Sequence, residues 1–434
     1  MKVAIYTLGC KVNQTESEYM AELLSKSGFE IVGVNEEADY YIVNSCTVTA
    51  TADQKTRQNV RKFKRRHPNS VVILTGCMPQ AFPKDAEKLI EADIVMGNRR
   101  SGDILDVINE YSVAKNRIIK ISEHEKGDRF ADCSITKFSE RVRAFVKIED
   151  GCNRFCSYCI IPMSRGRVRS KPLKDLENEV ENLANNGIKE IVLVGINLSS
   201  YGLGENFNLV DAVKICAKNE KIKRVRLSSL EPDNITDEII EELSKIEKLC
   251  PQFHISLQSG CDKTLRKMNR HYNSDEYRAL CNKLRSSFTD ATITTDVMVG
   301  FHEETEEDFY DCLNFVREIA FQKVHVFPYS EREGTAASRR GDSVPKAEKE
   351  RRAHIMISET SKIRENYLKT LVGKKETVLF ENVLNGCEYQ GYTKNYTLVK
   401  ANFNKNIIGE ELPVIIDKAE GDFCHGTILL DSNI

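Results

Sequence analysis

Short apolar runs alternate with amphipathic stretches over most of the chain, and this alternation predicts strands followed by helices. The apolar runs of the first segment cover 3–8, 40–44, 71–75 and 92–97, and helical patterns cover 15–27 and 51–66. Continuously apolar strands separated by helices are typical of a parallel sheet that is covered on both faces. We therefore expect an N-terminal parallel α/β sheet domain over residues 1–120.

The alternation resumes over residues 142–343, after a polar connector that contains one candidate strand at 117–121. Apolar runs cover 144–148, 190–194, 224–227, 253–257, 292–299 and 323–327, and helical stretches cover 172–186, 210–218, 236–248, 274–287 and 304–319. Six strands alternating with helices predict a partial (β/α)6 barrel, because a complete barrel needs two further repeats. The active site of such a barrel lies at the carboxyl ends of its strands.

A connecting helix and a small β-rich module complete the chain. The connecting segment, 344–373, has a charged helical stretch at 346–371, with Pro345 suited to its start and Gly373 just past its end. Residues 374–434 contain short β-like runs separated by glycine and asparagine. This pattern predicts a small β-barrel.

Composition limits the class of protein more than its function. A chain of 434 residues suggests roughly three domains at about 150 residues each. We find no signal peptide and no apolar run near the ~20 residues that span a membrane, so we expect a cytoplasmic protein. In that reducing compartment, clustered cysteines are more often metal ligands or catalytic groups than disulfides. The formal net charge of −2 gives no support for nucleic-acid binding.

One cysteine triplet follows the first barrel strand. Cys152, Cys156 and Cys159 form the pattern CxxxCxxC, one thiolate short of a closed structural zinc site. Three thiolates can hold three irons of a four-iron cluster and leave the fourth iron open to a small molecule. Structural zinc with a fourth ligand elsewhere is the alternative.

A second triplet is dispersed in the sequence. Cys10, Cys46 and Cys77 each come just after the carboxyl end of a predicted strand in the first domain. Ligands bind at that edge of open α/β sheets, so we expect the three cysteines to converge on a shared ligand. The alternative is three separately buried cysteines, since free cysteine packs as a small hydrophobe. The other eight cysteines are interpreted as structural.

The motifs resemble a known family over nearly the whole chain. CxxxCxxC with Tyr158 before the third cysteine resembles the radical S-adenosylmethionine (SAM) superfamily. "TLGCKVNQTES", "NSCTVTATADQKTR" and "TGCMPQ" resemble the N-terminal domain of the methylthiotransferases, and "RAFVKIEDGCNRFCSYCIIPMSRGRVRS" resembles their radical SAM core. The last segment resembles their RNA-binding TRAM domain. "GCKVNQ" and "CTVT" are most similar to the MtaB-type branch, which acts on threonylcarbamoyladenosine at position 37 of tRNA.

The resemblance implies cofactors and partners. Cys152, Cys156 and Cys159 would hold the 4Fe-4S cluster that binds SAM, and SAM cleavage would give a 5′-deoxyadenosyl radical. Cys10, Cys46 and Cys77 would hold a second 4Fe-4S cluster, which carries sulfur that a second SAM methylates. The methylthio group would join carbon 2 of the adenine. Implied partners are tRNA, a sulfur source and an electron donor such as a flavodoxin or ferredoxin. No association with a membrane is expected.

The resemblance also implies further contacts to the cofactor. These are the Tyr158 backbone, Gly195, Asn197, Glu231 and Gln258. Polar residues that end strands can equally cap the following helix. The chain departs from the family where His302 and Glu303 replace a Pro-Gly turn, which puts that loop's geometry in doubt.

Two surfaces are candidates for RNA binding. A basic run in one predicted helix can neutralise phosphates, and it comprises Lys55, Arg57, Arg61, Lys62, Lys64, Arg65 and Arg66. A solvated helix face is the alternative. In the last module, Tyr392, Lys394 and Tyr396 combine rings for base stacking with a cation, although tyrosines also fill small barrel cores.

Three functions thus remain open from the sequence. The first is a radical SAM tRNA methylthiotransferase acting on threonylcarbamoyladenosine. The second is the same chemistry on isopentenyl-adenosine in tRNA or on a ribosomal protein. The third is a non-catalytic RNA-binding protein with zinc in both cysteine clusters.

Overall fold

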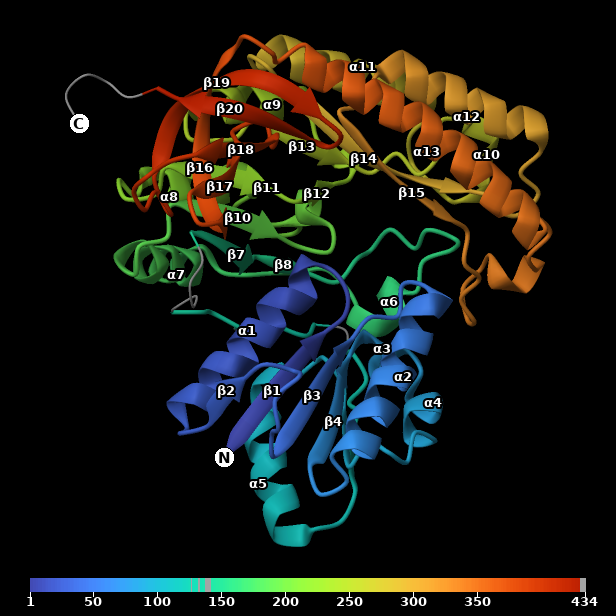
Figure 1. The fold of residues 1–434 in the computed structure, drawn as a ribbon. Helices are drawn as coiled ribbons and strands as arrows, with labels where there is room; N and C mark the ends of the chain where they lie inside the picture. Colours follow the sequence, from blue (N-terminus) through green and yellow to red (C-terminus); the bar gives the residue numbers. More distant parts are fainter. Residues whose placement is uncertain (126, 132, 137–141, 430–434) are drawn as a thin grey trace.

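The computed structural model describes residues 1–125, 127–131, 133–136 and 142–429 (Figure 1). Parts of the predicted connector and the last five residues of the predicted C-terminal module lie outside these ranges. Three structural parts follow one another along the chain. Figure 1 shows the N-terminal part (blue) and the C-terminal barrel (red) on opposite sides of the central part.

The N-terminal part is the predicted parallel α/β domain. Its six strands lie in the order β2-β1-β3-β4-β5-β6, and every neighbouring pair is parallel. The strands are β1 (Lys2–Thr7), β2 (Glu30–Val32), β3 (Tyr40–Ser45), β4 (Val71–Gly76), β5 (Ile94–Met96) and β6 (Ile118–Lys120). The candidate strand in the connector is confirmed as β6. The exposed strand β2 lacks a continuous apolar run, and the sequence did not predict it.

Helices cover both faces of this sheet. They are α1 (Lys11–Lys26), α2 (Ala50–Arg66), α3 (Cys77–Ala81), α4 (Pro83–Glu87) and α5 (Ile104–Ala114). Met20 of α1 and Ile108 of α5 belong to one buried cluster, and Phe63 of α2 belongs to the cluster on the other face. The apolar strands are therefore continuous because both of their faces are buried.

The central part is the predicted partial barrel. Its six main strands are β7 (Arg143–Lys147), β10 (Glu190–Val194), β11 (Arg224–Leu227), β13 (Gln252–Ile255), β14 (Thr292–Val299) and β15 (Lys323–Pro328). They form two parallel sheets, ordered β11-β10-β7 and β12-β13-β14-β15, with β12 being Ser229–Leu230. The helices are α6 (Ile161–Arg165), α7 (Leu173–Asn185), α8 (Leu209–Lys218), α9 (Asp237–Ser244), α10 (Asp262–Lys267), α11 (Ser274–Ser287) and α12 (Glu306–Ile319). A two-stranded ribbon, β8 (Glu149–Asp150) with β9 (Arg169–Ser170), flanks the cysteine loop.

The connecting helix and the C-terminal barrel also form as predicted. Helix α13 (Lys346–Lys369) leads into a closed barrel of five strands, β16-β17-β18-β20-β19. These strands are β16 (Lys375–Asn385), β17 (Glu388–Thr393), β18 (Leu398–Asn402), β19 (Glu411–Glu420) and β20 (Phe423–Ile428). In strand β17, Gln390 and Gly391 separate the two tyrosines, so no apolar run marked it in the sequence.

The C-terminal barrel docks on the amino ends of the central strands. Arg224, at the start of β11, donates to the carbonyl of Tyr392 at 2.7 Å, and Arg226 donates to that of Lys394 at 3.0 Å. Thr292, at the start of β14, donates to the carbonyl of Asn395 at 2.9 Å. The loop between β17 and β18 therefore closes one end of the central barrel.

The N-terminal domain faces the opposite, carboxyl end of the central strands. The amide of Ala50 donates to Ser330, just beyond β15, at 3.0 Å, and Arg332 pairs with Asp53 of α2.

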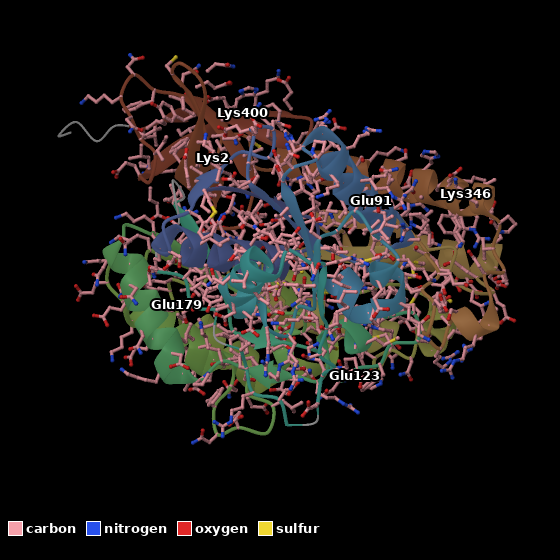
Figure 2. All side chains as sticks on the ribbon, turned by 90° about the horizontal axis from the view of Figure 1, so that it is seen from below. Lys2, Glu91, Glu123, Glu179, Lys346 and Lys400 are labelled. Carbon is pink, nitrogen blue, oxygen red and sulfur yellow. The ribbon has the colours of Figure 1, made fainter. Side chains whose placement is uncertain are left out.

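Viewed from below in Figure 2, Glu179 of α7 and Lys346 of α13 lie on opposite sides of the molecule. None of the helices in the described ranges combines the length and the apolar character that a bilayer span requires.

Candidate active site

The dispersed cysteines converge at the carboxyl edge of the N-terminal sheet. They follow β1, β3 and β4, which are neighbours in that sheet. The thiol of Cys10 donates to Asn13 Oδ1 at 3.3 Å, while Asn13 Nδ2 lies 4.0 Å from the sulfur of Cys77. Cys46 follows β3 directly, between the other two strands. The convergence predicted from the strand ends is confirmed, and the cluster they would hold stays a prediction.

Gly76 allows the ends of β3 and β4 to approach this closely. Its φ is +96°, and a Cβ there would lie 2.5 Å from backbone atoms of Ser45. Only glycine avoids both the left-handed strain and the clash. Asn98, which follows β5 in the N-terminal domain, donates through Nδ2 to the sulfur of Cys77 at 3.8 Å and to the carbonyl of Ser164 in α6 of the central part at 2.9 Å. The dispersed triplet therefore lies against the cysteine loop of the barrel.

The CxxxCxxC loop lies between β8 and α6, at the carboxyl end of the barrel. Arg270 donates to the sulfur of Cys156 at 3.3 Å and forms an ion pair with Glu231. Burial raises the pKa of the Cys152 thiol to about 11 and raises the pKa of Cys159 further. Cluster ligands must be thiolates, so loading this loop with iron would release protons.

The chemistry of the two triplets fits clusters better than a single ion. All fourteen cysteines are free thiols, and of the eight outside the triplets only Cys387 is exposed. Within the described ranges, no three His, Cys, Asp or Glu side chains are close enough to hold one metal ion together. A four-iron cluster binds each thiolate at a different iron, so its ligands need not meet at one point.

Two predicted SAM contacts have polar atoms that lack a hydrogen-bond partner among the residues the structure describes. Asn197 Nδ2 lies 4.0 Å from the sulfur of Cys152, and its Oδ1 is buried without a hydrogen bond. Gln258 Oε1 is likewise buried and unpaired, and its backbone has φ +64°, which strains a residue with a side chain. Buried polar atoms without partners are costly and concentrate at ligand sites. These residues therefore fit a polar ligand such as SAM.

Gly195 and Glu149 are packed against each other. A Cβ on Gly195 would lie 2.6 Å from Glu149 Oε2, and that oxygen accepts the backbone N–H of Asn197 at 2.7 Å. Burial raises the pKa of Glu149 to about 8. Glu149 was not among the residues predicted from the sequence, although the acidic pair at 149–150 directly before the cysteine loop is a signal for it.

The remaining two predicted cofactor contacts also lie at the loop. Glu231 pairs with Arg270, and burial raises its pKa. The ring of Tyr158 packs edge-on against Phe301, and its hydroxyl accepts a hydrogen bond from Arg270 at 3.5 Å. Arg270 thus connects Cys156, Glu231 and Tyr158, and no motif in the sequence had pointed to it. Contact of all five predicted residues with SAM stays a prediction.

A cavity of about 620 Å³ lies between the domains and extends into the barrel. The N-terminal domain contributes residues 9–12 to its wall, and Gly195 lines it near the cysteine loop. Inward-facing residues of the barrel strands line the rest, among them Ser228, His254 and Asp296. Tyr396 of the C-terminal barrel reaches the same cavity. All three parts of the chain therefore build one chamber.

Lys11 introduces a cation into this chamber. It directly follows Cys10, and its ammonium lies 5.9 Å from the centre of the Phe145 ring on β7. Burial, together with the nearby guanidinium groups of Arg143 and Arg226, lowers the pKa of Lys11 to about 8.

The predicted RNA-binding residues have varied surroundings. In the basic run on α2, Lys64 pairs with Asp93 at 2.9 Å and Arg61 pairs with Glu91 at 3.2 Å, so part of the charge of this run is neutralised. Lys55, Arg65 and Arg66 are exposed, and Arg57 and Lys62 are half-buried.

The two tyrosines of the module stack on each other rather than filling its core. The rings of Tyr392 and Tyr396 are 4.6 Å apart and 15° from parallel. The guanidinium of Arg143 lies 5.1 and 5.5 Å from the two ring centres. Their proposed stacking on bases stays a prediction. Lys394 lies between the two tyrosines in the sequence, and its carbonyl accepts a hydrogen bond from Arg226.

The turn that departs from the family is firmly held. His302 Nδ1 lies 2.9 Å from the carbonyl of Gly341. Glu304 accepts hydrogen bonds from the amide of Gly300 at 2.8 Å and from Arg352 of α13 at 2.7 Å. Side-chain contacts with α13 thus define this loop without a Pro-Gly turn.

Two family models match the chain. Residues 2–97 match the uncharacterized protein family UPF0004, and residues 146–316 match the radical SAM superfamily. The first match covers most of the N-terminal sheet, and the second covers the cysteine loop and most of the partial barrel.

Curated relatives align over nearly the full length. A threonylcarbamoyladenosine tRNA methylthiotransferase MtaB of Bacillus subtilis (strain 168) is 36% identical, covering 97% of this chain and 96% of that protein. The protein of the same name from Thermotoga maritima is 38% identical over 94% and 92%. A tRNA-2-methylthio-N(6)-dimethylallyladenosine synthase of Clostridium novyi (strain NT) is 35% identical over 98% and 96%.

Among solved structures, the fold is similar to a radical SAM methyltransferase, TsrM, from Kitasatospora setae. The TM-score is 0.55 at 12% identity, covering 75% of this chain and 72% of that one. At such low identity the likeness concerns the fold alone.

Proposed function

Because the chain belongs to the methylthiotransferase family of radical SAM enzymes, we propose that it methylthiolates carbon 2 of N6-threonylcarbamoyladenosine at position 37 of tRNA. Membership follows from 35–38% identity to MtaB proteins over about 95% of the chain. The protein is an enzyme that transfers alkylthio groups. The substrate, the second cluster and the number of SAM molecules are parts of the proposal.

The observation that carries the proposal is the shared chamber. Cys10 of the N-terminal triplet lines it, and so does Gly195, which packs against Glu149. Two residues further on, Asn197 Nδ2 lies 4.0 Å from the sulfur of Cys152 in the barrel triplet. A reaction that removes hydrogen at one cluster and delivers sulfur from another needs both groups to face the same substrate atom. A chamber that adjoins both triplets supports the proposal, whereas two independent structural zinc sites would not need one.

Each cofactor has residues suited to hold it. A 4Fe-4S cluster with SAM, bound at Cys152, Cys156 and Cys159, would supply the radical chemistry that an unreactive C–H bond requires. The amide oxygens of Asn197 and Gln258, which accept no hydrogen bond from any described residue, would orient SAM, and Arg270 would offset negative charge at Cys156. Cys10, Cys46 and Cys77 would hold the second cluster. The protein's own part is to bind, orient and exclude water.

The RNA must present an unpaired base to this chamber. Position 37 lies in a single-stranded loop, where proteins recognise splayed bases by stacking and by their edges. We propose that the exposed cations of α2 contact the phosphates and that Tyr396, which both stacks on Tyr392 and lines the chamber, helps to place the loop. An electron donor such as a flavodoxin or ferredoxin and a sulfur source complete the reaction.

Nucleoside mass spectrometry of tRNA tests the proposal in cells. Cells that lack the gene should lose 2-methylthio-threonylcarbamoyladenosine and accumulate its unmodified precursor, and the wild-type gene should restore it. A gene with the Cys152→Ala substitution is the matched control, and it should not restore the modified nucleoside. Loss of the dimethylallyl derivative instead would assign the enzyme to the other branch of its relatives.

A further inference from the structure

The chamber contains a cation that has no counter-ion. No residue in the described part of the chain forms a hydrogen bond or ion pair with the Lys11 ammonium. The neighbouring guanidinium groups differ in this respect, because Arg226 pairs with Glu190 at 2.8 Å and Arg143 pairs with Glu381 at 3.0 Å. A largely buried charge without a partner is costly unless a ligand supplies the opposite charge.

The other charged groups of the wall do not compensate Lys11. The carboxylate among the lining residues is that of Asp296, and His254 Nε2 lies 3.3 Å from it. His254 Nδ1 is in turn 3.0 Å from the hydroxyl of Thr294. His325 and Lys323 add further basic groups to the same wall. An anion entering the chamber would therefore meet mainly basic groups and hydroxyls, and the carboxylate of Asp296 lies beside His254.

A second polar atom in the wall also lacks a partner. Ser228 is 5% exposed, and its hydroxyl forms no hydrogen bond within the described residues. Ser228 follows β11 and lines the chamber together with Lys11. A hydroxyl and an ammonium that are both free suit a ligand group that carries a negative charge and accepts several hydrogen bonds.

The substituent on the proposed base has such a group. Threonylcarbamoyladenosine ends in a threonine moiety with a free carboxylate and a hydroxyl, whereas the dimethylallyl group of the other relatives' substrate is purely apolar. We propose, resting on the proposed function, that Lys11 and Ser228 bind the threonyl carboxylate and so select threonylcarbamoyladenosine over dimethylallyladenosine. A site built to pair with a polar group rejects an analogue that lacks it much more strongly than an apolar pocket rejects an extra group.

The test compares two stem-loop RNAs that differ in one charge. One carries threonylcarbamoyladenosine at position 37, and the other carries the same nucleoside with its carboxylate converted to the neutral carboxamide. Binding to the reconstituted holoenzyme is measured under anaerobic conditions at fixed salt, and methylthio product is measured in parallel. Wild type should bind the carboxylate RNA about ten- to hundredfold more tightly, the range expected for a hydrogen bond to a charged group.

Lys11→Met should remove most of this preference, because it should weaken binding of the carboxylate RNA and leave binding of the carboxamide RNA nearly unchanged. Lys11→Arg keeps the cation and should keep the preference. Lys174→Met, at an exposed lysine of α7 paired with Glu177, is the matched control and should behave as wild type. Equal binding of the two RNAs by wild type, or an unchanged preference in Lys11→Met, would overturn the inference.

Iron content and the absorbance spectrum of each variant show whether Cys10 still holds its cluster. If Lys11→Met loses iron, the Ser228→Ala variant is used instead. It should lower the preference for the carboxylate RNA over the carboxamide RNA severalfold, and an unchanged preference would refute the proposal. Failure of the proposed function would be recognised separately: wild type would then methylthiolate a dimethylallyl RNA and not the threonylcarbamoyl RNA. The binding comparison decides the inference in either case.

Discussion

Arg165 donates to both carboxylate oxygens of Glu16, at 2.7 and 3.0 Å, and so joins the barrel to the N-terminal domain. Arg165 also pairs with Asp150 at 3.1 Å, and Lys147 pairs with both acids at 3.1 and 3.2 Å. Burial opposes ionisation of Glu16, but Arg165 and Lys147 outweigh it and hold its pKa below the usual value. Because α1 begins after Cys10 and Asp150 precedes Cys152, this network fixes the two triplets relative to each other.

Breaking this pair should destabilise the protein strongly. Glu16→Gln leaves Arg165 buried without its bidentate partner, and we expect a loss of about 3–5 kcal/mol in the free energy of unfolding. Anaerobic denaturant unfolding measures it. Glu177→Gln, which removes an exposed pair with Lys174, should cost less than about 1 kcal/mol. Similar small effects of both variants would mean that the network does not hold the domains together.

Iron analysis tests the barrel triplet. Anaerobically reconstituted protein should bind about eight irons, the sum of two four-iron clusters. Replacing Cys152, Cys156 and Cys159 with alanine should remove about half of the iron and abolish SAM cleavage. The matched control is a protein with alanine at Cys216, Cys281 and Cys312, which are buried away from the two triplets. Unchanged iron in the first variant would show that this triplet is not a cluster site.

The dispersed triplet should have a separate role. A protein with alanine at Cys10, Cys46 and Cys77 keeps the CxxxCxxC loop, so it should still cleave SAM to 5′-deoxyadenosine under reduction. It should form no methylthio product, because the proposed sulfur-carrying cluster is lost. Both products are measured by liquid chromatography with mass spectrometry. Substantial methylthiolation by this variant would remove the need for a second cluster.

Gly195→Ala should weaken SAM binding. The new methyl group would lie 2.6 Å from Glu149 Oε2 and displace the carboxylate that accepts the Asn197 amide. We expect an affinity loss of about tenfold or more, as for the loss of one or two well-placed hydrogen bonds. Equilibrium binding of SAM to the holoenzyme measures it. Gly102→Ala, where the nearest atom is 3.4 Å away, is the control, and equal effects of both variants would exclude this role for Gly195.

The sequence allowed prediction of elements that carry a strong local pattern. The apolar runs of β3 and β14 are buried along nearly their whole length, and the continuous runs were sufficient to find them. Strands β2 and β17 were missed because β2 is mostly exposed and β17 has no continuous apolar run. The cysteines could be assigned to one site because strand ends in a parallel sheet meet at one edge.

Residues that act across domains could not be found from the sequence. Glu16 and Arg165 are 149 positions apart, and Arg270 reaches Cys156 from 114 positions away. Nothing local distinguishes such residues from surface charges. The C-terminal module shows the same limit, since its tyrosines suggested RNA stacking, while the docking of its loop on Arg224 and Arg226 depends on tertiary structure.

The central claim is tested most directly with purified components. Reconstituted enzyme, SAM, a reductant and a sulfide source are incubated without oxygen with tRNA that carries threonylcarbamoyladenosine at position 37, and the nucleosides are analysed by mass spectrometry. We expect a methylthio group to replace hydrogen at carbon 2 of that adenosine, and we expect no product when SAM is omitted. Unmodified threonylcarbamoyladenosine, recovered from enzyme that has both clusters and cleaves SAM, would contradict it.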